Sequence, residues 1–195
     1  MQHRRVEQRA EIDAARLEQP GNLLRLPHAL GRLGRNGDDV RVEREPIPRD
    51  DLPQLRYTNA IFSEGLRLYP PAWAIARRAL EDVELGGYLV PKSSIVLMCT
   101  FVTQRDARWY IDPEQFRPER WLGENPERPK FAYFPFGGGA RVCIGERFAG
   151  MEGPLLLASI AQKWRFTHVP GHKVEPRAQL TLRPRFGMQM TAVAR

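Results

Sequence analysis

Cys143 lies in a glycine-rich loop whose composition favours a metal-binding thiolate. Three consecutive glycines occupy positions 137 to 139, and apolar residues at helical spacing predict a helix from about Ile144 to Trp164. The N-terminus of a helix carries partial positive charge, so this position stabilises the anionic sulfur that ligation requires. Glycines also let the backbone approach a flat group closely. The loop therefore predicts a thiolate cradle for a flat cofactor.

The residues around Cys143 suit the remainder of such a cofactor. Arg141 can make a bidentate, charge-assisted contact with a carboxylate, and Phe136 offers an aromatic wall beside the sulfur. Gly145 removes a side chain where the helix would otherwise crowd a ring. The predicted cofactor contacts of the loop are Phe136, Gly137, Gly139, Arg141, Cys143 and Gly145.

Three other interpretations of this loop are weaker. A buried structural cysteine is the commonest state of a free thiol, but the pattern F-x-x-G-x-R-x-C-x-G arises by chance with a probability on the order of one in ten thousand or less. A zinc site lacks partners, because Cys99 is distant in sequence and the histidines show no paired ligand spacing. A phosphate-binding loop needs a following Lys-Ser/Thr or a preceding strand, and the sequence has neither.

The loop resembles the haem-binding signature of the cytochrome P-450 family of haem-thiolate monooxygenases. Two earlier segments carry the same resemblance in the family's order. Ser63-Glu64-Gly65-Leu66-Arg67 matches the family's E-x-x-R element, and the segment from Phe116 to Trp121 is similar to its P-E-R-F/W element. A Glu and an Arg three residues apart are common on helices, so the order and spacing of the three segments carry the resemblance.

The resemblance implies roles for residues outside the loop. It implies that Glu64, Arg67 and Arg120 form a buried charge network that holds residues 112–133, here called the meander, on the preceding helix. A second partner of a haem propionate is implied at Arg77, with Arg78 as the alternative. The implied substrate pocket, for which ordinary core packing is an equally good interpretation, contains Ala72, Trp73 and Ile75, with Leu180 and Thr181 as further candidates.

The predicted fold class is mixed α/β, mainly helical with small β-sheets, and the resemblance implies the C-terminal half of the cytochrome P-450 fold. Residues 1–50 are predicted to form a poorly defined, partly helical segment with a helical stretch at 6–17. Residues 51–195 are predicted to form the haem-thiolate region. Its first helix is predicted to begin with Asp51 as N-cap and to end at Tyr69, before Pro70 and Pro71.

Short apolar segments predict strands between and after the helices. These strands are predicted at 74–79, 83–85, 88–90 and 94–99, with smaller ones in 166–193. Gly86-Gly87 predicts a two-residue hairpin turn, because both glycines accept positive φ. In the helix after Cys143, the apolar side is predicted to contain Phe148, Met151, Leu155, Ile160 and Trp164.

The sequence also departs from the family pattern. A full family member is more than twice this long, and no segment before Asp51 resembles the family's O₂-activating helix with its acidic residue and Thr. We therefore expect an N-terminally truncated member without O₂-activating catalytic residues. Gln104 stands where the family often has His. Gly153-Pro154 predicts a kink or an early end of the helix near Glu152.

Composition and charge narrow the class of protein. The 195 residues are 42% hydrophobic and 27% charged, which is typical of a globular chain. The formal charge of +7 raises nucleic-acid binding, but the basic residues form no Lys/Arg-rich run, so no nucleic-acid partner is predicted. No apolar stretch approaches the roughly 18 residues of a membrane span, and no secretory signal is apparent. These features predict a cytoplasmic protein.

The resemblance implies a specific reaction. The expected cofactor is haem b, iron protoporphyrin IX, bound through the thiolate of Cys143. The expected activity inserts one atom of O₂ into a small apolar organic substrate, with electrons from a separate ferredoxin or flavoprotein reductase. The alternative is a non-catalytic remnant that binds haem weakly or not at all.

Overall fold

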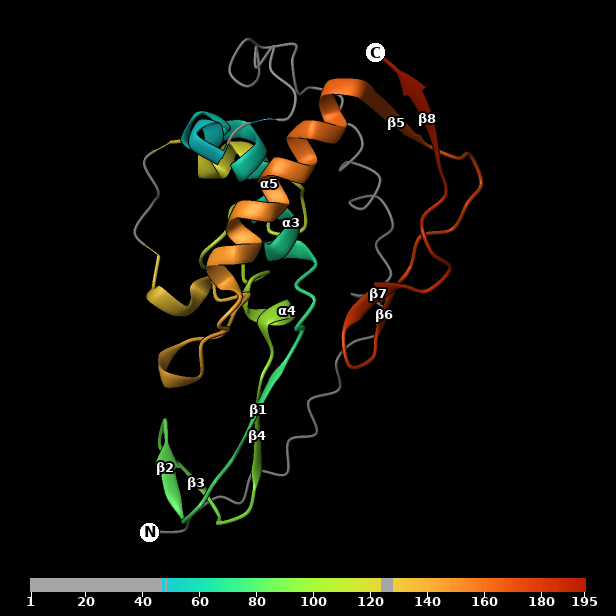
Figure 1. Cartoon of the computed structure of the whole chain (residues 1–195). Coiled ribbons are helices and arrows are strands. Elements are labelled where there is room, and N and C mark those ends of the chain that lie inside the picture. The colour runs from blue at the N-terminus through green and yellow to red at the C-terminus, as the bar shows by residue number, and fades with distance from the viewer. Residues whose placement is uncertain (1–46, 48, 124–127) are drawn as a thin grey trace.

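The computed structural model describes residues 47, 49–123 and 128–195, and the predicted helical stretch at 6–17 lies outside these residues. In the described part, helices and short strands alternate along the chain (Figure 1). The α-helices are α3 (Arg56–Leu68), α4 (Thr100–Thr103) and α5 (Glu146–Lys163). The 3-10 helices are η1 (Arg49–Gln54), η2 (Pro118–Trp121), η3 (Lys130–Ala132) and η4 (Gly139–Arg141). A mixed α/β chain is thus confirmed, whereas a mainly helical one is not.

The strands pair into two-stranded antiparallel ribbons. In the described residues the pairs are β1 with β4, β2 with β3, β5 with β8, and β6 with β7. Gly86 and Gly87 have φ values of 58° and 82° between β2 and β3, so the predicted hairpin turn is confirmed. The strands are β1 (Ile75–Arg78), β2 (Val83–Leu85), β3 (Tyr88–Val90), β4 (Ile95–Met98), β5 (Trp164–His168), β6 (Pro176–Ala178), β7 (Leu182–Pro184) and β8 (Met190–Ala194).

Helix α3 begins later than the sequence predicted. Asp51 lies inside η1 and not at an N-cap, so that prediction is wrong. Leu55 occupies the cap position without a side-chain hydrogen bond, and its carbonyl accepts the N–H of Asn59 at 2.9 Å. The physical reason is that residues 51–54, including Pro53, belong to the 3-10 helix η1, whose turns are tighter than those of an α-helix. The α-helical hydrogen bonds start only after η1 ends.

The sequence predicts a kink or an early end near Glu152. Helix α5 continues through Gly153-Pro154 to Lys163, so the early end is wrong. Pro154 removes one helical N–H, but its ring is buried, which offsets part of the cost. A side chain on Gly153 would overlap the ring of Phe62 on α3. The glycine therefore lets the two helices approach closely.

The apolar side predicted for α5 is wrong in part. Phe148, Ile160 and Trp164 are exposed, and Met151 and Leu155 are only half-buried. The residues that α5 buries are Pro154, Ala158 and Ala161. Small residues take the most buried positions because α3 packs close to this side of α5, while Leu155 and Leu157 pack against the two core clusters from partly buried positions.

We expect Gly153→Ala to destabilise the chain. The added methyl group must displace Phe62, and overpacking of this kind costs about 1–3 kcal/mol, more than the roughly 1 kcal/mol by which Ala favours a helix. Gly150→Ala is the matched control, because no atom lies within 4 Å of its added Cβ and the same helix gains the propensity. Urea unfolding of both variants measures the difference, and equal shifts would contradict the close approach.

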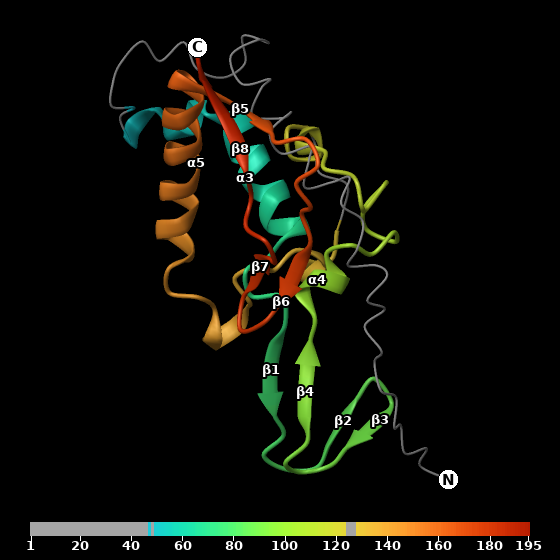
Figure 2. The same cartoon turned by 90° about the vertical axis from the view of Figure 1, so that its right-hand side faces the viewer.

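The core lies between the two long helices and the meander. One cluster contains Ile61, Leu68, Phe116 and Ala161, so it joins α3, the meander and α5. Figures 1 and 2 both show the β1–β4 ribbon extending away from these helices, with β2 and β3 near its far end. None of the helices in the described ranges has the length and apolar character of a membrane span.

Candidate cofactor site and the charge network behind it

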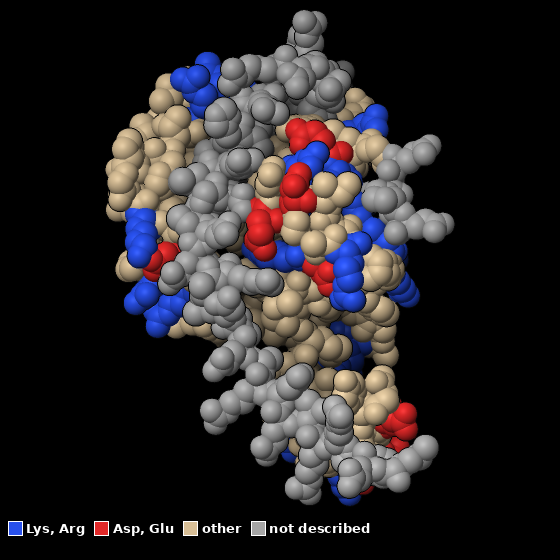
Figure 3. Space-filling view, turned by 180° about the vertical axis from the view of Figure 1, so that it is seen from behind, with Lys and Arg blue, Asp and Glu red and all other residues tan. Residues whose placement is uncertain are grey.

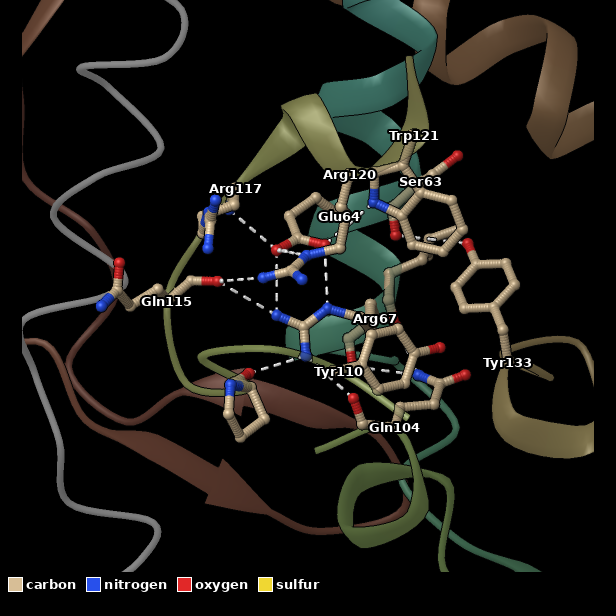
Figure 4. A network of polar contacts seen from close by, with 12 residues as sticks. Ser63, Glu64, Arg67, Gln104, Tyr110, Gln115, Arg117, Arg120, Trp121 and Tyr133 are labelled. Atoms are coloured by element: carbon tan, nitrogen blue, oxygen red, sulfur yellow. Dashed lines mark hydrogen bonds and ion pairs between the residues drawn. The ribbon is translucent and has the colours of Figure 1, made fainter. Parts of the chain in front are cut away.

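Glu64 and Arg67 form a bidentate ion pair on α3, with neither side chain exposed. Arg67 Nε and Nη2 donate to the two carboxylate oxygens of Glu64 at 2.8 and 2.9 Å. The residues are three apart, so they lie on the same face of the helix. Two charges removed from water are costly unless further partners satisfy them, and Figure 4 shows that the surrounding chain supplies these partners.

Arg67 holds the backbone of the segment that follows α4. Its Nη1 donates to the carbonyl oxygens of Gln104 and Pro113 at 2.8 and 2.7 Å, and its Nη2 donates to that of Gln115 at 3.1 Å. Tyr110 covers the guanidinium at 4.9 Å from the ring centroid. One buried cation thereby donates hydrogen bonds to three carbonyls, of which that of Gln115 also accepts Arg120 Nη2 at 3.3 Å.

Glu64 in turn binds the P-E-R-W element. Its Oε1 accepts the backbone N–H of Arg117 at 2.8 Å and Arg120 Nε at 3.0 Å, and its Oε2 accepts Trp121 Nε1 at 2.9 Å. Burial alone would raise the pKa of Glu64, but the bond and charge of Arg67, together with Arg117 and Arg120, outweigh it and lower the pKa. The carboxylate is therefore ionised and joins α3 to η2.

Sequence reasoning missed three aromatic members of this network, namely Tyr110 over Arg67, Trp121 and Tyr133. Trp121 completes the hydrogen bonding of Glu64, and its ring lies 4.7 Å from that of Tyr133. Tyr133 donates to the carbonyl oxygen of Ser63 at 3.2 Å, and burial raises the pKa of this phenol. The P-E-R-W resemblance contained Trp121, but no spacing rule connected it with Glu64.

The Cys143 loop presents its sulfur at the surface. Cys143 is exposed, and its backbone N–H donates to the carbonyl oxygen of Phe136 at 2.9 Å. The Cys143 carbonyl accepts the N–H of Glu146, the first residue of α5, at 3.2 Å. The thiol therefore lies shortly before the N-terminus of α5. The helix begins at Glu146, two residues later than the start predicted at Ile144.

The glycines of the loop have separate structural reasons. Gly137 and Gly139 have φ values of 78° and 68°, a region that other residues rarely adopt. A Cβ on Gly145 would lie 3.7 Å from Cys143 Sγ, which is an ordinary contact, so this glycine borders the sulfur itself. Gly138, which was not among the predicted contacts, lacks space for a Cβ because Phe131 lies against it.

Large apolar residues close to Cys143 in the sequence are exposed. They are Val142, Phe148 and Ile144, and Ile144 has a relative exposure of 103%. Exposed apolar groups on both sides of a thiol fit a broad, flat apolar ligand better than a small hydrated ion. The residues present thus fit the haem that the sequence implied.

Ile75, the first residue of β1, lies beside this loop. A Cβ on Gly137 would come within 3.3 Å of Ile75 Cδ1, so this candidate pocket residue borders the cysteine loop. Trp73 is half-buried and donates through Nε1 to the carbonyl oxygen of Gln179 at 2.7 Å, close in sequence to Thr181. Ala72 is exposed, and its carbonyl accepts Thr100 Oγ1 at 2.5 Å.

The predicted propionate partners and one of the further pocket candidates, Leu180, are at the surface. Arg77, Arg78 and Arg141 are all exposed, and Arg77 Nη1 donates to the carbonyl oxygen of Ala76 at 2.8 Å. Leu180 has a relative exposure of 96%. On the face in Figure 3, Lys and Arg side chains lie among Asp and Glu side chains without forming one continuous basic patch.

Comparisons with known proteins point to one family. The family model described as Cytochrome P450 matches residues 21–191. Cyclooctatin synthase of Streptomyces melanosporofaciens is 44% identical over 159 residues, which are 81% of this chain and 34% of the relative. Putative cytochrome P450 132 of Mycobacterium tuberculosis is 39% identical over 84% of this chain and 35% of the relative. Pentalenene oxygenase of Streptomyces avermitilis is 38% identical over 82% of this chain and 36% of the relative.

The chain spans about a third of the length of the curated relatives that it matches. Since the family model covers residues 21–191 and relatives at 38–44% identity cover four fifths of the sequence, this chain belongs to the cytochrome P450 family.

Proposed function

We propose that this chain contributes the thiolate ligand of a haem-dependent monooxygenase, with Cys143 as the residue that binds the iron. The observation that carries the proposal is that Cys143 is exposed shortly before the N-terminus of α5, and that the apolar residues next to it in the sequence are exposed as well. The positive end of the helix favours an anionic sulfur, and the apolar surroundings favour a porphyrin face. We further propose that these residues represent the C-terminal half of the fold.

The residues around the sulfur of Cys143 would bind and orient the haem. When bound, a thiolate-ligated haem b supplies reductive activation of O₂ and insertion of one oxygen atom into an organic substrate. Phe136 would pack beside the ligand, and Gly137 and Gly139 would let the loop backbone approach the ring. Arg141 and Arg77, with Arg78 as the alternative, would pair with the propionates.

The proposed substrate is a small apolar organic molecule. Two relatives are named pentalenene oxygenase and cyclooctatin synthase, and the first of these names supports an oxygen-inserting reaction for this chain. Ala72, Trp73 and Ile75 would line the substrate pocket, as the family resemblance implies, and Ile75 also borders the cysteine loop at Gly137. Electrons would come from a ferredoxin or a flavoprotein reductase, and the cytoplasmic location stays a prediction.

Reconstitution with haem tests the proposal. The full chain is titrated with haem, reduced and exposed to CO, and we expect the red-shifted Soret band that reports thiolate ligation. A chain that takes up no haem, or that gives the band of a haem with a nitrogen or neutral sulfur ligand, would support the non-catalytic remnant instead. Either result would overturn the proposed function.

Removing the charge of Arg141 is expected to weaken haem binding without removing the thiolate signature. A charge-assisted hydrogen bond contributes about 1.5–3 kcal/mol, so Arg141→Gln is expected to raise the haem dissociation constant by roughly ten- to hundredfold. Arg165→Gln, at an exposed position of β5, is the matched control and should leave the constant unchanged. Equal constants for the two variants would remove Arg141 from the proposed propionate partners.

A further inference from the structure

Gln104 is a buried amide between α3 and the cysteine loop. It follows α4, and its relative exposure is 0%. Its Nε2 donates to the carbonyl oxygens of Leu66 and Arg67, both at 3.0 Å. These carbonyls belong to the last turn of α3, where the helix itself provides no donors. The amide therefore completes the C-terminal end of the helix that carries the charge network.

The other end of the same amide binds the approach to the loop. Gln104 Oε1 accepts the backbone N–H of Phe134 at 2.9 Å. The Phe134 carbonyl accepts the N–H of Gly137, and the Phe136 carbonyl accepts the N–H of Cys143, each at 2.9 Å. A short series of hydrogen bonds thus connects the end of α3, through one side chain, with the backbone of the candidate ligand.

The chemistry of the position requires an uncharged group with donors and an acceptor. Two carbonyls on one side need N–H donors, while one N–H on the other side needs an acceptor, and a primary amide supplies both. The reversed amide would place its oxygen against two carbonyls, so the network fixes the orientation. The cation of Arg67 already donates to the Gln104 carbonyl at 2.8 Å, so a second cation here would be unfavourable.

We propose that Gln104 is a positioning residue for Cys143: it holds the 134–143 segment at a fixed distance from α3 and so sets the sulfur for ligation independently of pH. The inference rests on the proposed function only in naming Cys143 as the ligand. The hydrogen bonds that carry it are observed in the chain itself. Its test therefore begins without haem.

The first experiment compares Gln104→Met with the wild-type chain by hydrogen exchange. Methionine keeps the length of the side chain but removes both donor and acceptor, leaving buried groups unpaired. We expect amide exchange at Cys143 to rise by roughly tenfold or more, the change that one lost buried hydrogen bond produces, while β5 and β8 keep their protection. Gln189→Met, at an exposed side chain, is the matched control and should change neither region.

Two results of this experiment would overturn the inference. Unchanged exchange at Cys143 would show that the connection from Gln104 ends at Phe134. Equal acceleration in every segment would show general stabilisation rather than positioning. In the haem-loaded chain, the same variant is expected to lower the ratio of thiolate-type to neutral-type CO spectra roughly tenfold at a temperature where circular dichroism is unchanged. Absence of a thiolate spectrum in the wild type would instead count against the proposed function and leave the exchange result intact.

Gln104→His provides a second test if the methionine variant fails to fold. A neutral imidazole offers one donor and one acceptor, and protonation converts the acceptor facing Phe134 into a donor. Burial and the nearby Arg67 cation, whose charge is balanced in part by Glu64, would hold the pKa of this imidazole below its usual value near 6.5. Tyr110 also lies nearby, but burial raises the pKa of its phenol, so it stays neutral. The stability from the neutral form is then present at neutral pH and falls as pH drops below about 6.5.

The expected result for Gln104→His is a pH-dependent sulfur position. Exchange at Cys143 should resemble the wild type near pH 7.5 and should accelerate as pH falls toward about 5, after correction for the intrinsic pH dependence of exchange. The wild-type amide does not titrate in this range, so its corrected exchange should stay constant. Parallel profiles for the two proteins would overturn the inference.

Discussion

Replacing Cys143 with Ser is expected to abolish the red-shifted Soret band of the reduced, CO-treated chain, and replacing Cys99 with Ser is expected to leave it unchanged. Serine has nearly the shape of cysteine, but its hydroxyl does not ionise near neutral pH and cannot supply an anionic sulfur. Because the variant keeps the loop backbone, the hydrogen bond from residue 143 to Phe136 should persist. The expected change is therefore in ligation and not in folding.

The size of this effect follows from the role of a ligand. Changes in residues that only support a metal ligand typically cost ten- to hundredfold in affinity, so loss of the ligand itself should cost at least about hundredfold in haem affinity. Haem titration followed by absorbance gives this number, and circular dichroism shows whether Cys143→Ser remains folded. A folded variant that keeps the band would show that another group binds the iron.

Cys99 makes the contrast sharp because it is the other cysteine in the sequence. It is half-buried, and its Sγ donates at 3.5 Å to the carbonyl oxygen of Trp73, which is itself a candidate pocket residue. A loss of the band in Cys99→Ser, with the band intact in Cys143→Ser, would reverse the ligand assignment. A loss in both variants would indicate general damage to the site.

Local sequence signals predicted the elements and the position of the loop. The strands β1 to β4 and the Gly86-Gly87 turn follow from short apolar segments and from the conformations that glycine allows. The order of the three family segments predicted that the chain belongs to the cytochrome P450 family, which the family match over residues 21–191 confirms. These features depend on residues close together in the chain, so a single sequence contains them.

The contacts between distant segments were less predictable. Hydrophobic periodicity placed the large residues of α5 toward the core, but the close approach of Phe62 at Gly153 favours Ala158 and Ala161 on the buried side. A periodic pattern measures apolar character and not the distance to the neighbouring helix. Likewise, Gln104 stood out only as a departure from the family's His, while its three hydrogen bonds depend on groups 30 or more residues away.

Glu64→Gln is expected to lower the free energy of unfolding by about 3–5 kcal/mol at neutral pH, because it leaves buried cations without their counter-charge. The carboxylate accepts hydrogen bonds from Arg67 on its own helix and from Arg120 and Trp121 in the meander. Glutamine keeps the size of the side chain, but its NH₂ group would stand where a carboxylate oxygen accepts hydrogen bonds, so two donors would face each other. The network therefore loses charge and at least one hydrogen bond together.

The stability difference between the wild type and Glu64→Gln is expected to depend on pH. Burial favours the neutral acid, but the pKa of Glu64 is nevertheless lowered from 4.5 by the bond and charge of Arg67, by the Arg117 N–H and by Arg120. A group with a lowered folded pKa contributes stability that is present above its unfolded pKa and is lost as pH falls through the folded value. The difference between wild type and Glu64→Gln should therefore be largest near neutral pH and should narrow as pH falls below about 4.5.

Asp112→Asn separates this effect from the loss of an ordinary ion pair. Asp112 binds Arg117 at 2.9 Å, a distance similar to those in the buried network, but the two side chains are 48% and 44% exposed. Exposed pairs contribute about 0–1 kcal/mol, so this variant should change the free energy of unfolding several-fold less than Glu64→Gln does. Urea unfolding of both variants at neutral pH and at pH 4 measures the contrast. Similar losses, or a Glu64→Gln deficit that widens in acid, would mean that the meander is held on α3 by packing and not by the buried carboxylate.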